Sequence, residues 1–123
     1  EDQLYKGGDI KQLKNALVKN NILILLSDQD AKKKGTMAKF FGIDSSTHSG
    51  AAILSKRNRS PIIYTSITLK NNIYEVEFVH IDTSGSINDI VQHYTSEIEK
   101  TIINNPEQYF WFHKRWKSVR SYQ

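Results

Sequence analysis

Two groups of side chains in this 123-residue sequence could do chemistry. The first, Asp28-Gln29-Asp30, follows an aliphatic run at 22–26. If that run is a strand, the two carboxylates lie at its carboxyl end, where open α/β sheets place ligands. Carboxylates there can orient a base, bind a cation or accept hydrogen bonds from sugar hydroxyls. A turn with capping aspartates accounts for the same spacing equally well.

The second group is a basic aromatic segment near the C-terminus. It consists of Tyr109, Phe110, Trp111, Phe112, His113, Lys114, Arg115, Trp116 and Lys117. Aromatic rings beside lysine and arginine suit a membrane interface or a phosphorylated amphiphile. The same composition suits stacking on single-stranded nucleic acid. A helix that docks on the core and exposes a basic side is an equally good interpretation.

Most other catalytic chemistry is excluded by composition and spacing. With no cysteine, the chain has no disulfide, thiolate zinc site or cysteine nucleophile. Phosphate-loop, GxSxG, HExxH and GxGxxG motifs are absent. His93 and Glu97 could share a metal, but their spacing favours an ordinary solvated helical pair. None of the four histidines has an acid five positions later, the spacing that could form an oriented base for acyl transfer.

The net charge of +4 is divided into blocks. Residues 28–59 carry seven lysines and arginines against three aspartates, and residues 113–120 carry four cations and no acid. An acidic stretch lies between them. Such blocks attract phosphate, nucleic acid or acidic lipid headgroups, although a simply solvated surface has the same pattern.

The length allows one domain, and its periodicity predicts an α/β chain. The expected elements are a helix at 10–20, a buried strand at 22–27, a long loop at 28–46, a helix at 48–59, strands at 61–69 and 73–81, a helix from Ser86 to Pro106, and a final aromatic helix. The first strand, the second helix and the next strand predict a crossover unit, and hence a layered α/β/α fold. Because an apolar strand needs neighbours on both sides, we expect further strands before Glu1.

The C-terminal segment also resembles a known family. Residues 106–117, PEQYFWFHKRWK, are similar to the C-terminal signature of the late acyltransferases of lipid A biosynthesis, the lauroyl and myristoyl transferases. The sequences DQD at 28–30, FFG at 40–42, and Thr47 followed by GAA at 50–52 resemble that family's central block in the same order. The family's histidine-x4-acid motif lies further upstream. Residues 1–123 therefore resemble the C-terminal half of a single acyltransferase domain.

This resemblance implies a glycerophosphate-acyltransferase-like fold with a mixed sheet. It implies transfer of a fatty acyl chain from acyl carrier protein to a hydroxyl of a Kdo-bearing, phosphorylated lipid A precursor. The reaction would run at the cytoplasmic face of the inner membrane without metal or organic cofactor, and without nucleic acid as a partner. The chain alone is expected to be inactive. The alternative is a non-catalytic basic module that binds anionic lipid or single-stranded nucleic acid.

The resemblance also implies roles for individual residues. Asp28 and Asp30 would shape the active-site floor, one of them as a supporting acid. Phosphates or carboxylates would meet Lys114, Arg115 and Lys117, and Phe40, Phe41 and Trp116 would line the acyl side. The complete set of expected substrate contacts is Gln29, Phe40, Phe41, Gly42, Thr47, His113, Lys114, Arg115, Trp116 and Lys117.

Overall fold

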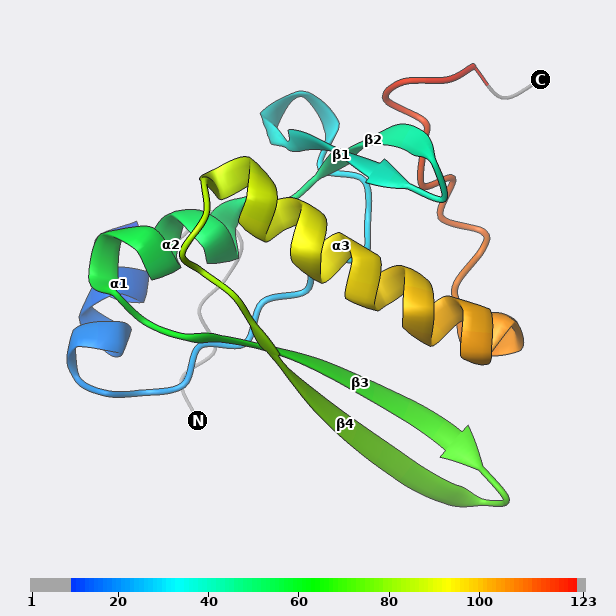
Figure 1. The fold of residues 1–123 in the computed structure, drawn as a ribbon, viewed down its shortest axis with the longest axis horizontal. Helices are drawn as coiled ribbons and strands as arrows, with labels where there is room; N and C mark the ends of the chain where they lie inside the picture. The colour runs from blue at the N-terminus through cyan, green and yellow to red at the C-terminus, as the bar shows by residue number, and fades with distance from the viewer. Residues whose placement is uncertain (1–9, 122–123) are drawn as a thin grey trace.

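The computed structural model describes residues 10–121, which form a mixed α/β arrangement of three α-helices and two antiparallel hairpins (Figure 1). The elements are α1 (Ile10–Val18), the 3-10 helix η1 (Lys32–Lys34), β1 (Thr36–Phe40), β2 (Ile43–Thr47), α2 (Gly50–Asn58), β3 (Ile62–Lys70), β4 (Ile73–Ile81), α3 (Ile87–Asn104) and the 3-10 helix η2 (Pro106–Gln108). The predicted helices at 10–20 and 48–59, the two strands at 61–69 and 73–81, and the helix after Ser86 are confirmed.

Helix α3 is the central element around which the others pack. It begins at a capping box, in which Ser86 and Asp89 satisfy each other's backbone N–H groups. Its apolar stripe is buried and contributes Ile90, Val91, Tyr94, Ile98 and Ile102 to two core clusters. One cluster also holds Ala38, Ala52 and Ile81, and the other holds Phe40. The stripe therefore joins the β1–β2 hairpin, α2 and the base of the β3–β4 hairpin.

Polar side chains of α3 bind the strands on either side. The Gln92 amide accepts from Lys39 N at 2.8 Å and donates to Lys39 O at 3.0 Å, so it pairs with the edge of β1 as a strand would. Glu99 accepts from the backbone N–H of Phe41 at 2.7 Å. These bonds satisfy edge groups of β1 that a lone hairpin would leave to solvent.

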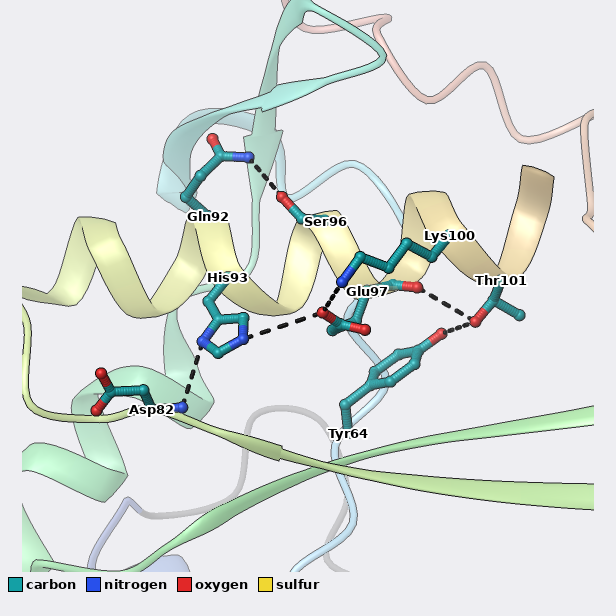
Figure 2. A network of polar contacts seen from close by, with 8 residues as sticks. All are labelled: Tyr64, Asp82, Gln92, His93, Ser96, Glu97, Lys100 and Thr101. Atoms are coloured by element: carbon teal, nitrogen blue, oxygen red, sulfur yellow. Dashed lines mark hydrogen bonds and ion pairs between the residues drawn. The ribbon is translucent and has the colours of Figure 1, made fainter. Parts of the chain in front are cut away.

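A second polar network faces the β3–β4 hairpin (Figure 2). Tyr64 and Thr101 share a hydrogen bond of 2.8 Å, which ties β3 to the helix. The buried Glu97 accepts from Lys100 at 2.6 Å and lies 4.0 Å from His93 Nε2. His93 Nδ1 in turn accepts from the backbone N–H of Asp82. The His93–Glu97 pair thus belongs to the packing of α3 on the end of β4, and the prediction of a solvated pair is wrong for Glu97, which is buried.

The β3–β4 hairpin extends away from the body of the protein (Figure 1). In its register Ile67 faces Val76, Leu69 faces Tyr74 and Thr65 faces Phe78, so these residues share one face of the ribbon. The large apolar residues on that face are all exposed: Ile63, Ile67, Leu69, Tyr74, Val76 and Phe78. We call these six residues the outer hairpin face. It is an apolar surface without a partner in the described residues.

The prediction of a buried strand at 22–27 is wrong. The segment has no regular secondary structure and no strand partner in the described part of the chain, and Ile22, Ile24 and Leu26 are exposed. A strand buried on both faces needs neighbouring strands and covering helices, which residues 10–121 do not supply here. The predicted crossover into β3 is therefore absent, and the two sheets are separate antiparallel pairs.

Two further segments differ from their predictions. The expected loop at 28–46 contains η1 and the β1–β2 hairpin, which turns at Phe41 and Gly42 with both residues at positive φ. Its second strand carries a run of short polar residues, and this hides the alternation that signals a strand. The aromatic segment follows η2 and forms successive turns rather than a helix, with His113 N–H donating to Phe110 O.

Candidate functional site

The fold brings the two sequence groups into contact. The C-terminal segment runs beside the β1–β2 hairpin (Figure 1). The Tyr109 hydroxyl donates to the carbonyl oxygen of Asp28 at 3.2 Å, and the backbone N–H of Asp30 donates to His113 Nε2 at 2.9 Å. Trp116 Nε1 donates to the carbonyl oxygen of Phe40 at 3.3 Å. Residues more than 70 positions apart in the sequence therefore form one site, which we call the docking junction.

The Asp30 carboxylate is buried at the centre of the docking junction. Its Oδ1 accepts from Lys32 N at 2.7 Å and from the Ser118 hydroxyl at 2.6 Å, and its Oδ2 accepts from Ser118 N at 3.2 Å. Burial by itself raises the pKa of Asp30, but these hydrogen bonds and the charge of Arg115 outweigh burial and hold the pKa below its usual value. Asp30 is thus an ionised anchor for the end of the chain.

His113 is held as a neutral imidazole. Because Nε2 accepts a hydrogen bond from Asp30 N, the ring proton of the neutral form lies on Nδ1. Burial lowers the pKa of His113, and the nearby Lys117 and Arg115 lower it further against the opposing charges of Asp28 and Asp30. The nitrogen that would accept a proton is therefore already used within the fold.

Arg115 points into the protein. Its guanidinium donates to the Ser45 hydroxyl, to Ser46 O at 2.7 Å and to Thr47 Oγ1 at 2.6 Å. Its Cζ also lies 5.1 Å from the centre of the Phe40 ring. The planar fork of arginine suits several oxygens at once, and here it partners the buried hydroxyls of Ser45 and Thr47, whereas the buried Ser46 hydroxyl donates to Lys32 O.

Aromatic rings form a layer beside this arginine. The fully buried Phe40 ring lies 4.8 Å from Phe41, 5.4 Å from Trp116 and 6.3 Å from Tyr109, between ring centres. Tyr109 meets Trp111 edge to face at 4.9 Å. An open cavity of about 410 Å³ adjoins this layer, and it is lined by Tyr109, Trp111, Phe112, Lys114, Arg115 and Trp116.

The expected site residues therefore divide into two sets. The docking junction and its aromatic layer bring together Asp28, Asp30, Phe40, Phe41, Thr47, His113, Arg115 and Trp116. Four residues are exposed around them: Gln29, Gly42, Lys114 and Lys117. Ser118 was missed in the sequence because it belongs to no motif. A run of short hydroxyl residues in a chain with an arginine far away in sequence was the signal that could have identified Ser45 and Ser46.

Two features are absent from the part of the chain that the structure describes. Across residues 10–121, no three histidine, aspartate or glutamate side chains converge as metal ligands would. In the same range, no helix combines the length and the apolar composition that a membrane-spanning segment needs.

The fold and site define an α/β chain in which a buried arginine and a buried aspartate hold a basic aromatic C-terminal segment. The family model for bacterial lipid A biosynthesis acyltransferases matches residues 2–118. Because this match spans nearly the whole sequence, the chain belongs to the bacterial lipid A biosynthesis acyltransferase family. The resemblance drawn from the C-terminal motif is thereby confirmed.

Individual relatives agree with this assignment. The chain is 27% identical over 117 residues to the lipid A biosynthesis palmitoleoyltransferase of Escherichia coli (strain K12) and equally to the lipid A biosynthesis acyltransferase of Shigella flexneri. Each alignment covers 89% of this chain and 38% of the relative. The chain thus spans well under half the length of the curated relatives it matches.

Proposed function

We propose that this chain is the C-terminal half of an acyltransferase domain acting in lipid A biosynthesis. The enzyme moves a fatty acyl chain from acyl carrier protein to a hydroxyl of a Kdo-bearing, phosphorylated lipid A precursor at the cytoplasmic face of the inner membrane. The observation that carries the proposal is the docking junction, in which the DQD segment at 28–30 and the C-terminal signature of this family contact each other.

The histidines of this chain have a limited role in the reaction. The acceptor hydroxyl attacks the thioester carbon, a new ester C–O bond forms, the C–S bond breaks, and the departing thiolate gains a proton. A base must take the hydroxyl proton. His113 is unsuited because its Nε2 already accepts from Asp30 N. The family resemblance implies that the base belongs to a histidine-x4-acid motif upstream of the matched residues, and we therefore expect the isolated chain to be inactive.

The residues of this chain then position and bind. Asp30 acts as a positioning residue, because both carboxylate oxygens are used by Lys32 and Ser118. Asp28 is half-buried beside it and shapes the active-site floor. Arg115 orders the C-terminal segment from inside, whereas the exposed Lys114 and Lys117 meet acceptor phosphates. Gln29 and Gly42 are exposed near these residues and contact the substrate.

Unpartnered apolar surfaces support the idea of a half domain. The outer hairpin face and the segment at 22–26 expose large aliphatic and aromatic side chains that monomeric proteins usually cover. In the complete domain, the remaining polypeptide covers these surfaces and joins the separate hairpins into the mixed sheet of a layered, glycerophosphate-acyltransferase-like fold. The proposal thus accounts for surfaces that the described residues leave open.

A chimera tests this function. The chain replaces the matching region of the E. coli palmitoleoyltransferase, and acyl transfer from acyl carrier protein to a lipid A precursor is assayed. We expect the chimera to transfer and the 123-residue chain alone to be inactive. A chimera that shows a cooperative thermal transition but no transfer would contradict the function, and activity of the chain alone would contradict the division of roles.

A matched pair of variants in the same chimera tests the carboxylates. Asp28→Ala with Asp30→Ala should reduce transfer strongly, whereas Asp44→Ala, on the exposed part of β2, should leave it near the parent value. Normal activity of the double variant would remove Asp28 and Asp30 from the site. A thermal melt of each variant separates loss of chemistry from loss of folding.

A further inference from the structure

The basic aromatic segment presents two opposite sets of side chains. Tyr109, Arg115 and Trp116 point inward and make the contacts of the docking junction. Phe110, Trp111 and Phe112 lie at the surface, with relative exposures of 60%, 49% and 89% for the three residues. We call these three outward residues the aromatic tip. Because soluble surfaces seldom expose consecutive large rings, the aromatic tip indicates a binding surface.

The aromatic tip is held in place before any partner arrives. Trp111 Nε1 donates to Pro106 O at 2.7 Å, and its ring packs edge to face on Tyr109. The rings of Phe110 and Phe112 lie 5.9 Å apart between centres. The next residue, His113, is fixed to Asp30 on the protein body. Inserting these rings into a partner therefore costs little ordering of the backbone.

Charge identifies the chemistry of the partner. The exposed cations Lys114, Lys117 and Arg120 follow the aromatic tip, and residues 113–120 contain no acid. The outer hairpin face is also apolar, but its strands carry Glu75 and Glu77 against the single cation Lys70. Of these two surfaces of the described residues, the C-terminal one combines exposed rings with excess positive charge, the combination that favours an anionic lipid surface.

The ring geometry favours lipid over nucleic acid. Bases stack on the flat faces of aromatic rings that follow one another along a basic groove. Here the Trp111 and Tyr109 planes meet at 81°, and Phe110 and Phe112 at 51°, so the rings form a wedge and not a row of parallel platforms. A wedge beside cations suits insertion between lipid headgroups.

We propose that the aromatic tip, with Lys114 and Lys117, docks this protein on the surface of an anionic lipid bilayer. The rings enter the boundary between headgroups and acyl chains, and the ammonium groups meet lipid phosphates. This inference rests on the proposed function, whose acceptor is a membrane lipid. Docking in this orientation places the aromatic cavity of about 410 Å³ against the bilayer, because Trp111, Phe112 and Lys114 line it.

Vesicle binding of the purified 123-residue chain tests the proposal. Vesicles of phosphatidylcholine with phosphatidylglycerol are compared with phosphatidylcholine alone, across increasing salt. We expect binding to the anionic vesicles only. Phe110→Ser with Phe112→Ser should weaken it by at least about tenfold at every salt concentration, because it removes apolar burial. Lys114→Gln with Lys117→Gln should weaken it by about tenfold or more at low salt and less at high salt.

A matched control replaces equally exposed apolar residues elsewhere. Ile67→Ser with Val76→Ser, on the outer hairpin face, should bind vesicles as the unmodified chain does. Brominated lipids should quench tryptophan fluorescence, and Trp111→Phe should remove most of that quenching. All these side chains are exposed, so thermal melts should show folded variants.

Three results would overturn the proposal: full vesicle binding by the Phe110/Phe112 variant, loss of binding in the hairpin control, or salt-sensitive binding to single-stranded DNA without vesicle binding. The measurement involves no acyl transfer. An active chimera whose chain fails to bind vesicles would therefore reject only the docking surface. Vesicle binding together with an inactive, folded chimera would reject only the proposed function.

Discussion

The Ser118 hydroxyl and the Asp30 carboxylate form a hydrogen bond of 2.6 Å across 88 positions of sequence. The backbone N–H of Ser118 donates to the other carboxylate oxygen at 3.2 Å, so one residue occupies both sides of the carboxylate. This contact closes the C-terminal segment over the loop that carries the DQD motif. It places the aromatic tip and the exposed lysines at a constant position relative to the rest of the site.

Loss of the Ser118 hydroxyl should loosen this closure. We expect Ser118→Ala to lower the free energy of unfolding by about 1 kcal/mol, because a charge-assisted hydrogen bond is lost while the backbone N–H contact remains. Urea unfolding measures the change. Ser121→Ala, at an exposed position three residues later, is the control and should be neutral. Equal effects of the two substitutions would contradict the role of Ser118.

Acidification should remove the stabilisation that His113 provides. Burial lowers the pKa of folded His113 below its value of about 6.5 in the unfolded chain, so the unfolded state takes up the proton first. This contribution is complete above about pH 6.5 and is lost as the pH falls towards the folded-state pKa. Urea unfolding between neutral and mildly acidic pH should show the decline.

Substitution of His113 separates its effect on stability from other causes of acid sensitivity. His113→Gln can still accept from Asp30 N and does not titrate, so it should flatten the decline below about pH 6.5. His80→Gln, on the exposed part of β4, should leave it unchanged. A decline that persists in His113→Gln would assign the titration to another group.

We expect protonation of Asp30 to cause a separate loss of stability at lower pH. Although burial opposes it, hydrogen bonds from Ser118 and Lys32 hold the pKa of Asp30 below the value of about 3.9 expected for an unfolded chain. Its stabilisation is therefore complete above about pH 4 and is lost as the pH falls through the folded-state pKa. Asp30→Asn should reduce stability at neutral pH and weaken this acid dependence, whereas the exposed Asp44→Asn should do neither. If the stability of Asp30→Asn fell at acidic pH as steeply as that of the unmodified chain, this would contradict the assignment to Asp30.

Arg115 should act as a structural residue that lysine cannot replace. Arg115→Met leaves Ser45, Ser46 O and Thr47 without their donor, and we expect a loss of about 2–4 kcal/mol in unfolding free energy. Arg115→Lys should recover little, because one ammonium group cannot reach the same oxygens as a planar fork. The exposed Lys117→Met should change stability by less than about 0.5 kcal/mol. Full stability of Arg115→Lys would contradict the fork geometry.

Two glycines should respond in opposite directions to alanine. A Cβ at Gly35 would lie 2.2 Å from Ser46 Oγ and 2.6 Å from Ala31 Cβ, so Gly35→Ala must move the β1–β2 hairpin and should cost about 1–3 kcal/mol. A Cβ at Gly50 meets open space at the start of α2, so Gly50→Ala should be neutral or stabilising by up to about 1 kcal/mol. Thermal melts of the two variants compare them, and equal destabilisation would contradict the packing at Gly35.

The elements that could be predicted from sequence are those with strong local signals. Helix α3 has a capping box at Ser86 and an uninterrupted apolar stripe, and the β3–β4 hairpin has its turn at Asn71 and Asn72. The strand prediction at 22–27 was wrong because an apolar run looks the same in a sequence whether or not partner strands exist. The β1–β2 hairpin was missed because its buried hydroxyl residues resemble a loop.

By itself the sequence determined the family, the three α-helices, the long hairpin and the basic aromatic character of the C-terminus, because local patterns of neighbouring residues carry each of them. Only the tertiary structure decided that Arg115 points inward while Lys114 and Lys117 face solvent, and that Asp30 is an anchor. The physical reason is that the direction of a side chain in a turn follows from distant partners. Here those partners are the hydroxyls of β2 and Ser118, and no periodicity along the chain encodes them.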